Sequence, residues 1–146
     1  MIDQFFNRDA NHVPITNLGL VASKAITYVA ATTGAVGATT LFTVTGVVAL
    51  RIFGKVSGAD LTGSGTLEVG ISGNTAALLA QTTGTALDIG EFWIDNGPAT
   101  IETLPSQQLV GADVIQTIGT NTITAGTITY YCLWNPISDD GNVVAA

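Results

Sequence analysis

The chain has very little charge: four of its 146 residues are basic and 11 are acidic, for a net charge of −7. Typical soluble domains have about a quarter of their residues charged. An acidic chain is repelled by the phosphates of nucleic acids and by anionic membrane surfaces. We therefore expect neither nucleic acid nor a membrane among its partners.

Cysteine and histidine are almost absent, since Cys132 and His12 are the only residues of these types. One cysteine excludes a disulfide within the chain and a CxxC metal site. His12 has no nucleophile beside it in the sequence, as a Ser-His or Cys-His arrangement requires. We therefore predict a non-enzymatic protein without a metal or another cofactor.

A secretory signal and a membrane span are also not indicated. The first six residues lack the basic start and apolar stretch of a signal peptide, so we expect synthesis in the cytoplasm without a signal peptide. Two uncharged runs, 25–50 and 114–138, are long enough to cross a membrane. Thr and Gly interrupt both runs with the period of a strand, which favours the strands of a soluble sheet protein.

Threonine and glycine are plentiful, and apolar residues alternate with them. The clearest segment is 42–56, where every second residue from Phe42 to Val56 is apolar or glycine. This period of two predicts one buried and one half-exposed face. The segment is long for a single strand, so Gly46 is the expected place for a turn, a bulge or a change of sheet.

The same alternation recurs in short runs at 26–31, 67–71, 92–94, 114–118 and 128–134. Turn-forming clusters separate them, at 57–58, 63–65, 72–74, 96–98 and 119–121. Residues 75–81 contain good helix formers but are too few for an isolated helix, so we predict a strand there. The pattern is typical of a β-sandwich or barrel, and we predict an all-β, antiparallel, two-sheet sandwich formed by one domain over residues 25–146.

The alternation also predicts which side chains lie inside. The expected core residues are Val44, Val48, Leu50, Ile52, Val69, Ile71 and Tyr130. On the opposite phase, Val47, Ala49 and Phe53 are expected to form apolar surface. A monomer with such a surface tends to aggregate, which favours a homo-oligomer.

Residues 1–24 show no alternation, and Pro14 excludes a helix around it. We predict an extended N-terminal arm. The adjacent Phe5 and Phe6, with Arg8, are the candidate contact residues of this arm. The sequence leaves two alternatives: the arm contacts a neighbouring subunit, or it packs on its own domain.

Other chemically active residues have ordinary structural interpretations. Cys132 shares the apolar phase of its strand and is expected to be a buried structural thiol. Glu91 and Asp95 share one phase of a strand, but single acids scattered through strands usually provide solubility rather than hydrolase chemistry. The run 139–142 lacks the ligand spacing of a calcium loop and is predicted to be a turn after the last strand.

Two strings resemble a known group of proteins. The string 41–48, continued at 52–56, resembles the first core strands of small virion proteins of tailed bacteriophages. The string 123–131, followed by 133–138, is similar to the closing strands of the same group. The resemblance covers about residues 26–143, and these proteins are small β-sandwiches, often jelly rolls, that include head decoration (cement) proteins.

The resemblance implies a structural protein of the capsid surface, commonly a homotrimer, that binds between major capsid subunits. Expected partners are then other copies of the chain and the major capsid protein, and the expected location is the virion. The alternative is a carbohydrate- or receptor-binding sandwich of a phage fibre or tail, because jelly rolls also serve as lectins. Exposed aromatic residues in loops would favour that alternative, whereas Trp93 and Trp134 are predicted to lie within strands.

Overall fold

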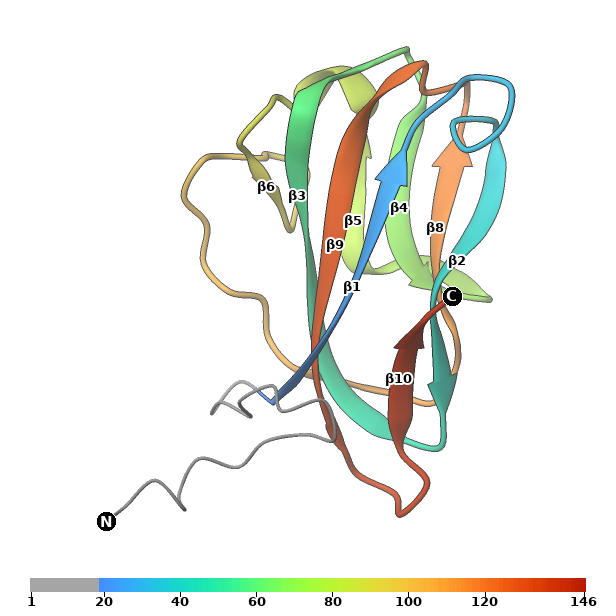
Figure 1. Ribbon diagram of the computed structural model, residues 1–146, viewed down its shortest axis with the longest axis vertical. Helices are drawn as coiled ribbons and strands as arrows, with labels where there is room; N and C mark the ends of the chain where they lie inside the picture. The colour runs from blue at the N-terminus through green and yellow to red at the C-terminus, as the bar shows by residue number, and fades with distance from the viewer. Residues whose placement is uncertain (1–18) are drawn as a thin grey trace.

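The computed structural model describes residues 19–146, which form two antiparallel sheets packed face to face (Figure 1). The first sheet contains, in order, β1 (Leu20–Thr27), β9 (Ala125–Pro136), β3 (Val48–Thr62) and β6 (Phe92–Trp93), with β7 (Gln108–Val110) also paired to β3. The second sheet contains, in order, β10 (Asn142–Ala145), β2 (Gly37–Thr45), β8 (Val114–Gly119), β4 (Thr66–Ile71) and β5 (Asn74–Thr83). Among the described residues the one helical element is the short 3₁₀ turn η2 (Gly84–Ala86).

The strand order is that of a jelly roll. The orders β1-β9-β3-β6 and β2-β8-β4-β5 make up the eight strands of that fold, and β7 and β10 are additions. The chain therefore changes sheet repeatedly, and β9 lies between β1 and β3 although both are distant from it in the sequence. The predicted fold class is confirmed, and so is a strand over residues 75–81, which lie in β5.

Gly46 marks the change of sheet within the long alternating segment. Strand β2 ends at Thr45 in the second sheet, and β3 begins at Val48 in the first. Gly46 has a φ of 62°, which glycine adopts without the steric cost that a side chain brings. The predicted position of the break is confirmed.

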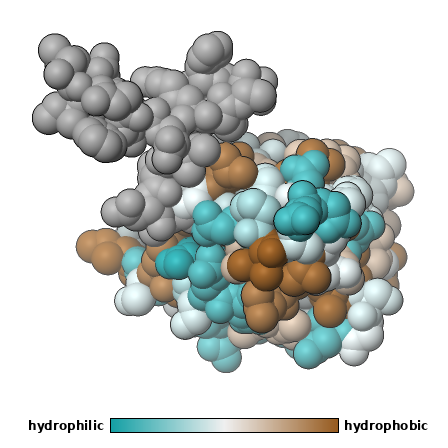
Figure 2. All heavy atoms as spheres, turned by 90° about the horizontal axis from the view of Figure 1, so that it is seen from below, coloured by the Kyte–Doolittle hydropathy of each residue, from teal (hydrophilic) through white to brown (hydrophobic). Residues whose placement is uncertain are grey.

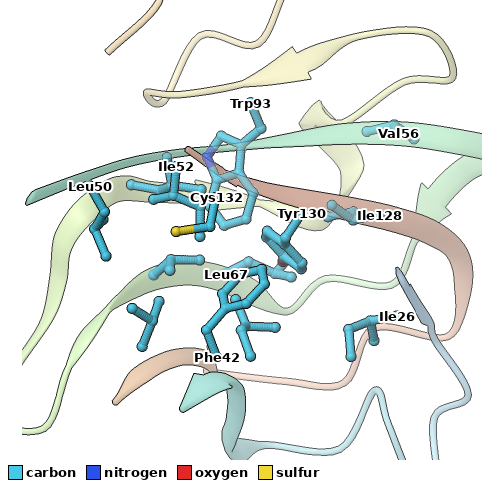
Figure 3. Close-up of a cluster of buried hydrophobic side chains, with 14 of the residues drawn as sticks. Ile26, Phe42, Leu50, Ile52, Val56, Leu67, Trp93, Ile128, Tyr130 and Cys132 are labelled. Carbon is cyan, nitrogen blue, oxygen red and sulfur yellow. The ribbon is translucent and has the colours of Figure 1, made fainter. Parts of the chain in front are cut away.

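The core lies between the sheets (Figure 3). Of the predicted core residues, Val48, Leu50, Ile52, Val69 and Tyr130 are buried, and Val44 and Ile71 are half-buried and pack against them. Complete burial of one such aliphatic side chain contributes about 1.5–3 kcal/mol of transfer free energy. The two-residue period therefore identified the inward face of these strands correctly.

The structure corrects three predictions about element boundaries and faces. Residues 20–24 were assigned to the N-terminal arm, but they belong to β1 and pair with β9 from Leu20 opposite Trp134. The turn expected at 57–58 is part of β3, where the pairing with β9 is interrupted after Ser57 and resumes at Thr62. Ala49 is buried rather than exposed, because β7 pairs with β3 at this position and places Leu109 opposite it.

The alternation in the sequence placed Phe92 and Ile94 on the apolar, inward phase of β6, but the opposite phase faces the core. The inward residue of β6 is Trp93, which is fully buried, while Phe92 and Ile94 are half-exposed. The indole Nε1 of Trp93 donates a hydrogen bond to the carbonyl of Ala80 on β5, at 3.2 Å. This bond links the first sheet to the second.

Candidate functional site

Aromatic side chains gather on the outer face of the first sheet. Along β3, Arg51, Phe53 and Lys55 alternate with buried residues and are half-buried on that outer face. The ring of Phe53 stacks on Tyr131 of β9, with centroids 5.3 Å apart and planes at 25°. The same ring meets Phe92 of β6 edge-on, at 5.9 Å and 73°. Three strands thus contribute to one aromatic row.

A cation completes this row. The ammonium of Lys55 lies 4.0 Å from the centroid of the Phe92 ring and donates a hydrogen bond to the carbonyl of Gly90, at 2.7 Å. Such cation–π contacts are worth about 0.5–1 kcal/mol at exposed sites. Lys55 therefore fixes the position of the short strand β6 on the sheet.

A cavity of about 220 Å³ opens beside these rings. Phe53, Phe92 and Ile94 form one wall, and residues 102–105 of the connection between β6 and β7 form the other. Glu102 supplies the one carboxylate of an otherwise mainly apolar lining. Ligand pockets for drug-sized molecules usually measure about 300–1,000 Å³, so this cavity has room for a single side chain or a small ligand group.

The outer face of the second sheet has a different chemistry. Its outward positions are mainly threonines, and the strands of this sheet contain one aromatic residue within the described chain, Phe42, which is fully buried. Glu68 of β4 accepts hydrogen bonds from the hydroxyl of Thr75 and from the amide Nε2 of Gln81, the latter at 2.9 Å. Glu68 therefore links β4 to β5 across this face, whereas the buried hydroxyl of Thr117 on β8 has no partner within the described residues.

Apolar side chains also meet at the lower end of the sandwich. Val47, between β2 and β3, accepts backbone hydrogen bonds from Ile137 and Ser138, at 2.9 and 3.1 Å. Val47 and Ile137 are 39% and 59% exposed, so the prediction that Val47 lies on the surface is confirmed. Figure 2 views this end from below and shows apolar patches interrupted by hydrophilic groups.

Three polar side chains lie at the centre of the core. The hydroxyls of Tyr28 and Tyr130 each lie 2.5 Å from the amide oxygen of Gln116 and 3.1 Å from one another. Burial raises the pKa of both phenols above the ordinary value, and the neighbouring phenol raises that of Tyr130 further. The Nε2 of Gln116 is buried and has no partner within the described residues. The sequence analysis did not predict this cluster. The signal for it was Gln116, a polar residue on the same inward phase as Val114 and Ile118.

The predicted contact residues Phe5, Phe6 and Arg8 lie outside the described residues, as does His12. Cys132 is fully buried in the core, as predicted. Burial raises the pKa of its thiol from 9.0 to about 12. A nucleophilic cysteine needs a lowered pKa, so this thiol is inert at neutral pH.

The acidic residues bond to their own turns. Glu91 accepts from the backbone N–H of Asp88 at 3.1 Å, and Asp95 accepts from that of Gly97 at 2.7 Å. Asp140 accepts from the hydroxyl of Ser138 at 2.6 Å. The turn predicted at 139–142 does not follow the last strand as expected, because it connects β9 to a further strand, β10, which begins at Asn142. Over residues 19–146, no group of three or more His, Cys, Asp or Glu side chains is placed to hold a metal ion.

Within the described part of the chain, no helix has the length and apolar character needed to cross a membrane. No protein-family model, curated protein or solved structure matches this chain. The site that sequence reasoning missed is the row of Phe53, Tyr131 and Phe92 with its cavity. Phe53 was expected on the surface, but only the pairing of β3 with β6 and β9 brings the other two rings to it.

Proposed function

We propose that this protein is a non-enzymatic structural protein of a bacteriophage virion, of the capsid decoration (cement) type. The observation that carries the proposal is the outer face of the first sheet. Phe53, Tyr131 and Phe92 lie there half-buried, on the same face as exposed apolar side chains such as Val21 at 50%. Surface of this kind marks contact with another protein.

The particle contact therefore uses this outer face of the first sheet. A decoration protein needs many copies of one modest contact rather than a reaction centre. Aromatic rings provide large contact area with few rotatable bonds, which suits such a contact. The threonine-rich face of the second sheet, whose polar groups can bond to water, then remains in solvent.

The jelly roll supports this proposal by analogy, because viral capsid proteins commonly have this architecture. Architecture alone does not determine function, since lectins share it. The resemblance of 41–56 and 123–138 to small virion proteins supplies the remaining part of the proposal. We accordingly propose a homotrimer bound between major capsid subunits, with Phe5, Phe6 and Arg8 of the N-terminal arm contributing to the contact.

The test is the composition of particles from cells that carry this gene. Particles are purified on a density gradient, and the copies of this chain per major capsid subunit are measured by quantitative mass spectrometry. A fixed ratio close to that of a capsid lattice site supports the proposal. Absence from the particles contradicts it, and a few copies per particle would indicate a tail or fibre position instead.

A second candidate function is a carbohydrate- or receptor-binding module of a fibre or tail. The cavity beside Phe53 and Phe92 favours it, because aromatic rings next to the polar groups of Lys55 and Glu102 can bind a small ligand group. Trp93 and Trp134 do not contribute, since both are buried within strands as predicted. A glycan array separates the two functions: selective binding that Phe53→Ser abolishes supports this module over the decoration protein.

A further inference from the structure

We propose that the cavity beside Phe53 and Phe92 is a docking site for the chain's own N-terminal segment, with one ring of the Phe5-Phe6 pair as its occupant in the free protein. This proposal goes beyond the particle function and does not depend on it. If both hold, docking shields the two phenylalanines until assembly brings a neighbouring subunit.

The chemistry of the cavity matches that segment. Its walls are largely apolar, and its volume of about 220 Å³ has room for one aromatic side chain. Charges of both signs lie beside it, with Lys55 above the Phe92 ring and Glu102 in the opposite wall. In the segment, Asp3 precedes the phenylalanine pair, and Arg8 follows it as the nearest charge on that side, before Asp9. Asp3 can thus pair with Lys55 and Arg8 with Glu102 while a phenylalanine ring enters the apolar cavity.

The length of the segment is sufficient. Twelve residues separate Phe6 from Gly19, the first described residue, and such a stretch spans up to about 40 Å when extended. Ser23 of β1 is paired to Tyr131, and Tyr131 is paired to Phe53, so the cavity lies four residues along β1 from Gly19. Moving along β1 by about 3.4 Å per residue, and across three strand spacings of about 4.8 Å, covers roughly 20 Å.

The same tether favours the chain's own segment over that of a second copy. A short linker holds its end near the site at an effective concentration in the millimolar range. The free protein at micromolar concentration supplies far fewer segments from other molecules. The occupant in a dilute solution is therefore the segment of the same chain.

Trypsin provides the first test, because Arg8 is the one basic residue before Lys24. Docking protects the bond after Arg8, and cleavage there follows the undocked population. We expect Leu104→Asp, which places a charge in the cavity wall, to speed this cleavage by about tenfold. Ile101→Asp is the matched control, since Ile101 is in the same connection, is 87% exposed and does not line the cavity.

The partner substitution makes the test independent of any damage to the loop. Phe5→Ser with Phe6→Ser should speed cleavage as much as Leu104→Asp does, and combining all three should add nothing, as two halves of one contact require. Additive effects, or equal cleavage of Leu104→Asp and Ile101→Asp, would overturn the proposal.

A cysteine pair identifies which chain docks. In the variant Phe5→Cys/Leu104→Cys, mild oxidation should form an intrachain disulfide about tenfold faster than in Phe5→Cys/Ile101→Cys. The buried thiol of Cys132 does not compete, because its pKa is raised to about 12. Products are separated by non-reducing electrophoresis and mapped by mass spectrometry. Mainly interchain disulfides, or equal rates for the two pairs, would contradict docking within one chain.

Discussion

The two outer faces of this sandwich are built on the same core but differ in what they offer to a partner. On the first sheet, Phe53, Tyr131 and Phe92 form a row of rings, and Lys55 contacts one of them. On the second sheet, threonines dominate, and Glu68 is engaged by neighbouring side chains. The face with hydroxyls in place of charges can bond to water, whereas we propose that the face with aromatic rings in their place is a contact surface.

If the faces differ only in surface chemistry, a change in the shared core must weaken both sheets together. Leu50→Ala removes a fully buried side chain, and we expect it to lower the free energy of unfolding by about 2–5 kcal/mol. Urea unfolding, followed by circular dichroism and by fluorescence of Trp93 and Trp134, measures the loss. A loss below about 0.5 kcal/mol, the usual range for surface substitutions, would contradict the assigned core face.

The polar cluster sharpens the comparison because it joins the sheets. Gln116 comes from β8 of the second sheet, whereas Tyr130 comes from β9 of the first and Tyr28 follows β1. Gln116→Leu leaves two buried hydroxyls without their acceptor, so we expect a loss of about 1–3 kcal/mol. Adding Tyr28→Phe and Tyr130→Phe should recover part of this loss. Full additivity of the three changes in urea unfolding would argue against the cluster.

Alkaline pH acts on the same buried groups. Burial raises the pKa of Cys132 from 9.0 to about 12 and raises those of Tyr28 and Tyr130, so each group keeps its proton longer in the folded state. The unfolded state releases these protons first, and stability therefore falls as the pH rises above about 9. We expect each of the three groups to contribute a slope of up to about 1.4 kcal/mol per pH unit between pH 10 and 12, so the total slope is shallower in Cys132→Ala. A stability that stays constant over this range would contradict the burial of these groups.

A smaller effect separates contact from stability on the first face. Phe53→Ser removes the central ring of the row but leaves the buried residues of β3 in place, so we expect a loss of about 1 kcal/mol or less beyond its area burial. The proposed particle contact should weaken far more than the fold. Thermal unfolding and particle binding, measured on the same preparation, test whether the two effects are separate.

Local pattern was sufficient for the central strands and most of the core, but not for β7, β10 or the first residues of β1. The alternation around Leu50 and Tyr130 identifies their inward phase, and Gly46 identifies the change of sheet. Long-range pairing determines the features that the pattern missed. Ala49 is buried only because β7 pairs with β3, and the break in pairing after Ser57 depends on the register with β9.

The aromatic row is another feature that depends on long-range pairing and that the sequence pattern missed. Phe53, Phe92 and Tyr131 are separated by 39 residues in each interval, and the alternation says nothing about which strands are neighbours. The alternation also does not determine which phase of the short strand β6 faces the core, because Phe92, Trp93 and Ile94 are consecutive large apolar residues. The structure resolves this ambiguity by burying Trp93 against β5.

The central claim is that the outer face of the first sheet, and not that of the second, makes the particle contact. Val21 and Val144 form a matched pair for it, because both are strand valines on opposite sheets, 50% and 48% exposed. Particle occupancy is measured for Val21→Lys and Val144→Lys by quantitative mass spectrometry of gradient-purified particles. The account predicts that Val21→Lys lowers occupancy by about tenfold while Val144→Lys leaves it nearly unchanged, since a charge must be desolvated only in the contact. Equal occupancy for the two variants, or a loss confined to Val144→Lys, would contradict it.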